Sequence, residues 1–255
     1  MGNIILLQGG MGDFLQFLPF VDANRKNNLR YCCISHLKGA KEFWNTVGIE
    51  LEEVFIFNTL EEQNLILNAL PKTEKYMHCL RGQYFDIYPF DHQKPLFTNN
   101  KPTIGVHVNG SHFSIDTQKK FGMILKSIPA RVIKELKSKD YNLMVFGLEE
   151  ELKGMGIRQS ETLKFVCDPN PAKSLAYVGQ CYAVVGSDSG IKTMSSMNGM
   201  PTFVWLGDYV DPPRDQNFID PYVKDGVMKV FRYKDVEAQF DRGMAMTKQF
   251  IAELF

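Results

Sequence analysis

The sequence predicts an α/β protein built from two Rossmann-like domains that face a cleft. Strand and helix patterns alternate along its 255 residues, and such alternation is typical of parallel sheets covered by helices. The first strand, Asn3 to Gln8, is a near-continuous apolar run of the kind buried in parallel sheets. A linker-like stretch over 93–102 interrupts the pattern with prolines and asparagines. We therefore expect an N-terminal domain over 1–98 and a C-terminal domain over 99–255.

Each expected element follows from its local pattern. The strands are apolar or alternating runs, expected at 3–8, 29–34, 53–57, 75–79, 103–108, 141–146, 163–166, 182–186 and 202–206. The helices have apolar residues at helical spacing, expected near 13–24, 38–47, 60–70, 129–139, 172–181, 190–198 and 236–254. After the strand at 141–146, the acidic run at 149–151 suits a helix N-terminus, because the helix dipole favours negative charge there.

Composition and charge narrow the classes of function. The formal net charge is +0, so the chain has no global basic field for nucleic acid, although a local patch stays open. Five cysteines form an odd set without a C-x-x-C motif, which indicates a reducing, cytoplasmic environment. Five histidines show no H-x-x-x-H pattern or cysteine–histidine cluster. No signal peptide is evident, and no apolar stretch reaches the ~20 residues of a membrane-spanning helix.

The turn Ser187 to Gly190 is the most informative segment. It joins the apolar run 182–186 to a helical pattern from 191, and a second apolar run follows at 202–206. A turn of this kind directs the free N–H groups of a helix start toward the sheet edge, where α/β proteins bind ligands. We expect Asp188, Ser189 and Gly190 to bind an anion, most plausibly a nucleotide phosphate. The alternative is that Asp188 and Ser189 only cap the helix.

A second glycine-rich turn, Gly9 to Asp13, follows the first strand. It matches neither the G-x-G-x-x-G motif nor a P-loop. Its glycines allow a sharp bend and close approach to a ligand. Asp13 then opens a helix, where it acts either as a cap or as a carboxylate that accepts a proton at the sheet edge.

A third turn opens the second half. Asn109, Gly110 and Ser111 follow the strand at 103–108, and Lys119 and Lys120 come soon after. Backbone N–H groups, the hydroxyl and the ammonium groups would all suit a phosphate. The alternative for each lysine is a solvated basic loop.

These turns together resemble glycosyltransferase family 9, the heptosyltransferases. The resemblance rests on Gly12-Asp13 with Pro19, on the strand and turn 104–111, on 174–181, and most specifically on 184–190 with 199–207. It implies the two-domain GT-B fold with a C-terminal helix that crosses back onto the first domain. It also implies metal-independent, inverting transfer of a sugar from a nucleotide-diphosphate donor, with no other cofactor. The absence of Asp-x-Asp agrees with this class.

Two features depart from the family pattern. Thr193 stands where the family has a histidine, with Lys192 beside it as a substitute cation, and the N-terminal half is short for the family. The resemblance therefore supports the expected donor site more directly than the expected acceptor. The acceptor implied by the resemblance is a bacterial surface glycan, or a modified nucleic-acid base if the gene is viral.

The chemistry assigns roles to these residues. Asp13 would remove the acceptor proton as general base. The donor turn, with Lys119, Lys120 or Lys192, would stabilise the leaving diphosphate. Two alternatives stay open: another nucleotide-sugar enzyme, such as an epimerase, and a non-catalytic protein that binds a nucleotide or glycan.

Overall fold

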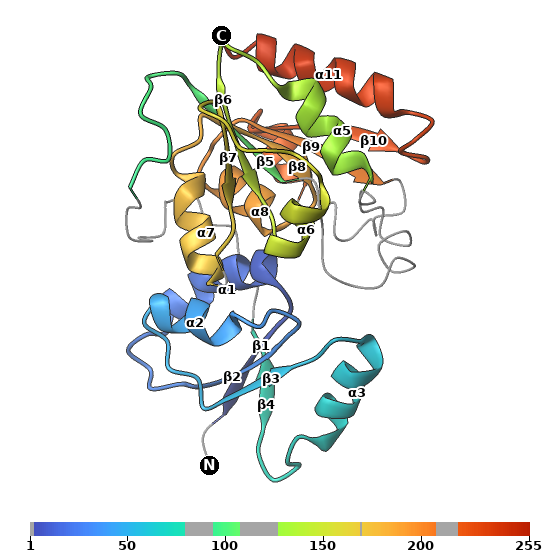
Figure 1. Ribbon diagram of the computed structural model, residues 1–255. Coiled ribbons are helices and arrows are strands. Elements are labelled where there is room, and N and C mark those ends of the chain that lie inside the picture. The colour runs from blue at the N-terminus through green and yellow to red at the C-terminus, as the bar shows by residue number, and fades with distance from the viewer. Residues whose placement is uncertain (1–2, 80–93, 108–126, 169, 208–218) are drawn as a thin grey trace.

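The computed structural model describes residues 3–79, 94–107, 127–168, 170–207 and 219–255. Within these ranges the chain forms two parallel β-sheets, each covered by helices. The two α/β units are stacked end to end, with the N-terminus at one end of the molecule and the C-terminus at the other (Figure 1). The predicted fold class, two Rossmann-like α/β domains, is confirmed.

The N-terminal domain is a parallel sheet in the order β3-β2-β1-β4. Its strands are β1 (Ile4–Gln8), β2 (Arg30–Ser35), β3 (Glu53–Ile56) and β4 (Tyr76–His78). Its helices are α1 (Met11–Ala23), α2 (Ala40–Thr46) and α3 (Leu60–Ala69). The strand order reverses between β1 and β4, because β2 and β3 extend the sheet on the other side of β1.

Both faces of the first sheet are covered, which explains the unbroken apolar run of β1. Leu7 faces the aromatic side chains of α1 and α2, where the rings of Phe14 and Trp44 are 5.1 Å apart. Leu6 faces the opposite cluster, against which Ile66 of α3 packs. A strand buried on both faces needs apolar residues at every position.

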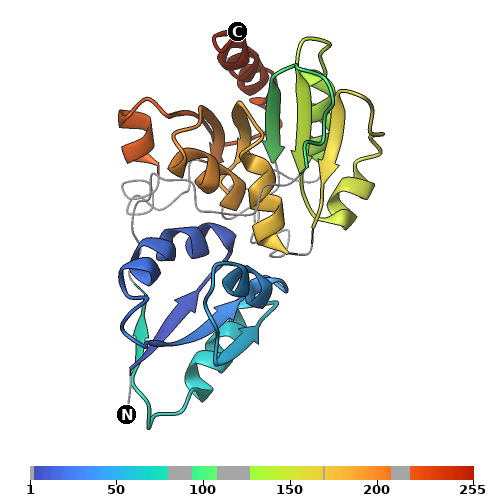
Figure 2. The same ribbon diagram turned by 90° about the vertical axis from the view of Figure 1, so that its left-hand side faces the viewer.

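The C-terminal domain is a larger parallel sheet in the order β10-β9-β8-β5-β6-β7. Its strands are β5 (Thr103–His107), β6 (Asn142–Phe146), β7 (Leu163–Val166), β8 (Ala183–Ser187), β9 (Thr202–Gly207) and β10 (Met228–Tyr233). Its helices are α5 (Ser127–Leu136), α6 (Glu149–Gly154), α7 (Pro171–Val178), α8 (Gly190–Met197), α10 (Asp220–Lys224) and α11 (Phe240–Ala252). Figure 2 shows this sheet above the N-terminal domain.

All the expected strands form, but β10 and α10 were missed. β10 is an edge strand that pairs with β9 alone among the described strands. Its exposed positions include Lys229 and Arg232, which interrupt the apolar run. Charged residues on an edge strand are a common protection against unwanted pairing, and they weaken the sequence pattern of a strand.

The structure corrects the expectation that the C-terminal helix crosses back onto the first domain. Helix α11 packs against α5 and β9 of its own domain. The Trp205 indole N–H donates to Thr247 Oγ1 at 3.0 Å, and Gly243 lies over the same ring, since a Cβ there would be 2.5 Å from it. The apolar side of α11 is therefore buried within the second domain.

The segment that precedes β5 forms hydrogen bonds with the second domain. The Gln180 side chain bonds the backbone of Lys94 and Leu96, and the amides of Asn99 and Asn142 bond each other. The first sheet ends at β4 and the second begins at β5, and the predicted boundary between 98 and 99 lies between them. Its exact position stays a prediction.

The two domains share one apolar core. This core joins α1 and α2 of the first domain to α7 and α8 of the second, with Phe14 and Phe43 on one side and Leu175 and Met194 on the other. The domains are therefore packed directly on each other along these helices.

Candidate functional site

The starts of α1 and α8 meet at the domain interface, and glycines allow this. A Cβ on Gly12 would be 3.6 Å from the Gly190 Cα and 3.2 Å from Thr193 Oγ1. A Cβ on Gly190 would be only 2.6 Å from Met11 Cε. Because neither glycine has a side chain, the two helices approach closely. The two glycine-containing turns, about 180 residues apart in sequence, thus become neighbours.

Asp13 lies on the backbone of the turn that precedes α1. The Gly10 N–H donates to Asp13 Oδ2 at 2.8 Å. Gly9 has a φ of +124°, and a Cβ there would be 2.2 Å from the same oxygen. The carboxylate is thus held at the carboxyl end of β1. Asp13 is the third residue of α1 and not its N-cap, which is Gly10; its carboxylate instead accepts from the N-cap N–H.

The start of α8 is capped by Ser189, as the sequence suggested. Its Oγ accepts from the Lys192 N–H at 3.4 Å, and its carbonyl accepts from Thr193 Oγ1 at 3.1 Å. The other first-turn N–H groups of a helix have no intrahelical acceptor, and they are the groups that would bind an anion.

Asp188 and Lys192 form an ion pair in this turn, with Nζ and Oδ1 2.9 Å apart. The Lys192 side chain is only 2% exposed and that of Asp188 is 18% exposed. The ammonium therefore neutralises the carboxylate, and the repulsion that a bare Asp188 would exert on a diphosphate is reduced. Sequence spacing was compatible with this pair, since residues four apart share a helix face.

Ser187, the last residue of β8, is a candidate that the sequence did not suggest. It is 2% exposed, and its Oγ has no hydrogen-bond partner within the described residues. Buried hydroxyls usually have a partner. A hydroxyl in this state immediately before the Asp188 turn is suited to bond a ligand.

The other half of the expected donor site falls outside the described residues. This holds for Asn109, Gly110, Ser111, Lys119 and Lys120. The strand before them, β5, ends at His107, which lies in register beside Gly186 of β8. A Cβ on Gly186 would be 2.1 Å from the His107 carbonyl oxygen. The strands that precede the two expected donor turns thus end side by side.

Thr193, which replaces the family histidine, is an interface residue. It is 4% exposed, and its hydroxyl lies against Gly12 of α1. The position is filled by contacts between the two domains.

A pocket of about 350 Å³ opens at the carboxyl end of the first sheet, between β1 and β4. It is lined by Leu6, Gln8, Gly9, Phe17, Gln63, His78 and Cys79. The strand order reverses at this point, and such switch points are where open α/β sheets bind ligands. Sequence patterns did not indicate this pocket, although Gln8 and His78 each end one of two neighbouring strands.

Residues typical of a metal site do not gather in the described part of the chain, where no three His, Cys, Asp or Glu side chains come together in a metal-binding group. Among the same residues, no helix is long and apolar enough to cross a membrane.

Comparison with known proteins gives structural matches only. No protein-family model and no curated protein sequence matches the chain. Among solved structures, the Escherichia coli ADP-heptose lipopolysaccharide heptosyltransferase II superposes with a TM-score of 0.55 at 11% identity, covering 97% of this chain and 100% of that one.

Two other structures show the same similarity. The spinosyn rhamnosyltransferase SpnG complexed with thymidine diphosphate has a TM-score of 0.60 at 7% identity, covering 99% of this chain and 92% of that one. A putative UDP-N-acetylglucosamine 2-epimerase from Listeria monocytogenes has a TM-score of 0.53 at 10% identity, covering 89% and 87%. The chain therefore has the GT-B fold that it shares with these nucleotide-sugar enzymes.

Proposed function

We propose that this chain is a glycosyltransferase that moves a sugar from a nucleotide-diphosphate donor to a hydroxyl acceptor, with inversion and without a metal. The observation that carries the proposal is the meeting of α1 and α8. Gly12 of α1 lies against Gly190 of α8, so the helix start that carries Asp13 and the helix start proposed to bind the anion are neighbours. A base and an anion site at one interface are what such a transfer needs.

Asp13 is the proposed general base. A hydroxyl is a poor nucleophile at neutral pH, and a carboxylate within hydrogen-bond reach removes its proton as the new bond to the sugar forms. Such a base contributes roughly 10²–10⁴-fold to the rate. The hydroxyl oxygen attacks the anomeric carbon from the face opposite the leaving diphosphate, so the configuration inverts.

The start of α8 is the proposed site of the donor diphosphate. Its first-turn N–H groups, the Ser189 hydroxyl and the buried Ser187 hydroxyl would stabilise the charge that develops on the leaving group. Asp188 is paired with Lys192, so the turn approaches neutrality before the donor binds. Asn109, Gly110, Ser111, Lys119 and Lys120 complete this proposed site from the neighbouring strand end.

Support for a nucleotide-sugar donor also comes from proteins of the same fold. The E. coli heptosyltransferase WaaC was solved with ADP, and SpnG with thymidine diphosphate. We propose a cytoplasmic enzyme whose acceptor is a surface glycan, or a modified base if the gene is viral.

The proposal is tested by incubating the protein with nucleotide-diphosphate sugars and acceptor mixtures, and by mass spectrometry of the products. Nucleotide release coupled to a glycosylated acceptor is expected, and EDTA should leave the rate unchanged. A strict requirement for magnesium or manganese would contradict the metal-independent mechanism. A thermal-shift screen against nucleoside diphosphates selects the donor first, because a bound ligand raises the apparent stability.

An epimerase is the second candidate, because a putative epimerase also shares the fold. The two functions differ in product: an epimerase changes the sugar without joining it to an acceptor. Nucleotide binding without either product would favour the non-catalytic alternative.

A further inference from the structure

We infer that the two domains form one fixed, cooperatively folded unit, so that a nucleotide reaches the start of α8 without the domains moving apart. The first part of the inference is independent of the proposed function, and the part about the nucleotide rests on it. Domains of one chain are expected to move relative to each other unless their interface is large and hydrophobic. The burial of α1 and α8 and the composition of the shared core indicate an interface of that second kind.

Helix α8 is enclosed on all its sides. All eight of its residues, from Gly190 to Met197, are buried, including Lys192. One side contacts β8 and β9 of its own sheet, and another contacts α1 of the first domain. A helix at the surface of a domain normally keeps an exposed polar face. Helix α8 is therefore an interior helix of the whole molecule, and it depends on the first domain for part of its cover.

Helix α1 of the first domain is enclosed in the same way. Residues 14–18 are consecutive and all buried, with Gln16 8% exposed and the others 3% or less. Five consecutive residues point to every side of a helix, because one turn takes 3.6 residues. The sheet of the first domain covers one side of α1 through β1, and α8 covers another. Two helices, one from each domain, thus form a layer between the two sheets.

Apolar side chains fill the contact between the domains. One cluster contains Phe14 and Phe43 of the first domain together with Leu175 and Met194 of the second, and Met194 is the most exposed of these four at 4%. The helix pairs that bring them together are α1 with α8 and α2 with α7. Separating the domains would return these side chains to water, at a cost that grows with the apolar area exposed.

The first domain also needs this interface for its own stability. Its described part has only one other apolar cluster, a small one that includes Leu6 and Ile34 on the opposite face of the sheet. The larger cluster, with Leu7 and Phe14, is the one shared with the second domain. A small domain buries a smaller fraction of its surface and is only marginally stable by itself. We therefore expect the first domain to fold only together with the second.

The two tryptophans of the chain allow a direct test, because one lies in each domain. Trp44 of α2 belongs to the shared core and Trp205 of β9 to the separate core of the second domain. Labelling the full chain with fluorotryptophan gives two fluorine NMR signals, which Trp44→Phe and Trp205→Phe assign. In a urea titration of the wild-type protein both native signals should disappear at the same midpoint, because coincident transitions mark a single cooperative unit.

Leu136→Ala is the decisive variant in this titration. Leu136 of α5 is 0% exposed and belongs to the core of the second domain alone. In one cooperative unit its loss lowers the midpoints of both signals equally, whereas in separate units only the Trp205 signal would move. Leu175→Ala makes the same change in the shared core and should also lower both. Ile133→Val removes one methylene from the core that contains Leu136, and it replaces Leu136→Ala if that protein does not fold.

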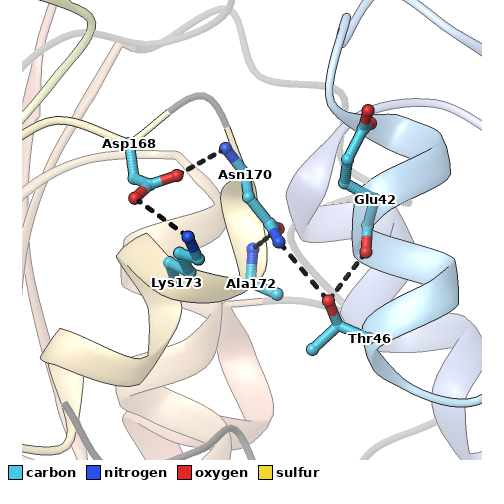
Figure 3. Close-up of polar contacts among 6 residues, drawn as sticks. All are labelled: Glu42, Thr46, Asp168, Asn170, Ala172 and Lys173. Carbon is cyan, nitrogen blue, oxygen red and sulfur yellow. Dashed lines mark hydrogen bonds and ion pairs between the residues drawn. The ribbon is translucent and has the colours of Figure 1, made fainter.

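A cross-link tests the part about the nucleotide. Thr46 of α2 and Asn170 of α7 meet across the domains, with Oγ1 and Nδ2 3.4 Å apart (Figure 3). Cys167→Ser removes the exposed cysteine, and the other four are buried. In that background a short bismaleimide can join Thr46→Cys to Asn170→Cys. Stopped-flow measurements with ADP and thymidine diphosphate should give the same association rate and affinity for the joined protein and for the unjoined protein with the same substitutions.

Separate midpoints for the two signals in the wild-type protein, or a Leu136→Ala protein in which only the Trp205 signal moves, would overturn the first part of the inference. Slower association in the joined protein would overturn the second part, because it would mean that the domains must open for the nucleotide to enter. Absence of nucleotide binding in both forms would contradict the proposed function and the second part with it, while the fluorine signals decide the first part independently.

Discussion

The starts of α1 and α8 have similar sequences, but the aspartate at each start has a different kind of partner. Each helix follows a buried parallel strand, and each turn contains a glycine and an aspartate. At α1, Asp13 lies inside the helix and accepts a backbone N–H. At α8, Asp188 precedes the helix and pairs with the ammonium of Lys192, while Ser189 provides the cap.

This difference separates the two roles that one reaction needs. The Asp13 carboxylate is held in place by a backbone N–H. A carboxylate neutralised by a buried lysine leaves the helix start with a net attraction for an anion. In the proposed function, the same motif serves as the base in one domain and as the anion site in the other.

Asp13→Asn should give the largest effect. The amide cannot take the acceptor proton, so transfer should fall by about 10²-fold or more, while nucleotide affinity stays near that of the wild type. Rates of product formation and calorimetric titration measure the two quantities.

Asp22→Asn is the matched control, because it makes the same change near the other end of α1, where Asp22 pairs with the half-exposed Arg25. Exposed pairs contribute little, so transfer should stay within about 2-fold of the wild type. Near-normal turnover in a folded Asp13→Asn protein would leave Asp13 only a cap.

Lys192→Met should affect stability and nucleotide affinity together. Removing one partner of a buried pair leaves the other uncompensated, but Asp188 is 18% exposed, so we expect a loss of about 2 kcal/mol, below the full buried-pair value. Nucleotide affinity should fall by about 10-fold, because the bare carboxylate repels the diphosphate. Denaturant unfolding and calorimetry measure these changes.

The double variant Asp188→Asn with Lys192→Met tests this explanation. It removes both charges, and both losses should be partly restored. Additive losses in the double variant would mean that the two residues act independently.

Gly190→Val tests whether the glycine at the start of α8 is needed for packing between the domains or for ligand binding. A side chain at position 190 would meet Met11 of α1, since a Cβ there would be 2.6 Å from the Met11 Cε. The expected result is a loss of stability of about 1–2 kcal/mol from overpacking. Nucleotide affinity should also fall by about 10-fold, because the added side chain displaces the start of α8.

Met11→Ala in the Gly190→Val background makes room for the new side chain. Restored stability and affinity would show that the glycine is needed for the contact between the domains. Restored stability with affinity still low would place the phosphate directly against Gly190, and unchanged affinity in the folded single variant would contradict the donor assignment.

The contact between α2 and α7 should give the smallest effect (Figure 3). Asn170 Nδ2 donates to Thr46 Oγ1 across the domains at 3.4 Å, and Asn170 Oδ1 accepts from the Ala172 N–H at 2.9 Å as the cap of α7. Thr46→Val should cost less than about 0.5 kcal/mol, because the bond is long and exposed.

Asn170→Ala should cost about 1 kcal/mol, because it also removes the cap. Asn170→Ser keeps a capping oxygen and should resemble Thr46→Val in chemical denaturation. A large loss in Thr46→Val would mean that this bond, and not the apolar core, holds the domains together.

Sequence patterns were sufficient for the elements and for the ends of the strands. The apolar run of β1 and the turn at Gly9 to Asp13 are local features, and so are β8 and the turn that contains Asp188. Since parallel strands end at one edge of their sheet, the sequence placed each aspartate at such an edge without knowledge of the other domain.

The sequence failed where a residue's role depends on a distant partner. The periodicity of α11 shows an apolar face but not which domain that face covers. In the structure it packs on the second domain, where Thr247 accepts a hydrogen bond from the Trp205 indole. The charged residues of β10 concealed a strand whose pairing with β9 is evident only once the sheet is assembled.

The composition of the site was decided by tertiary structure for the same reason. Local periodicity records which face of a helix is apolar, but not which element covers that face. The approach of Gly12 to Gly190 depends on how the two sheets pack through α1 and α8. The pocket likewise combines Gln8, Gln63 and His78 from three elements. The sequence by itself determined the two turns and their chemistry, and the packing of the domains determined that they face each other.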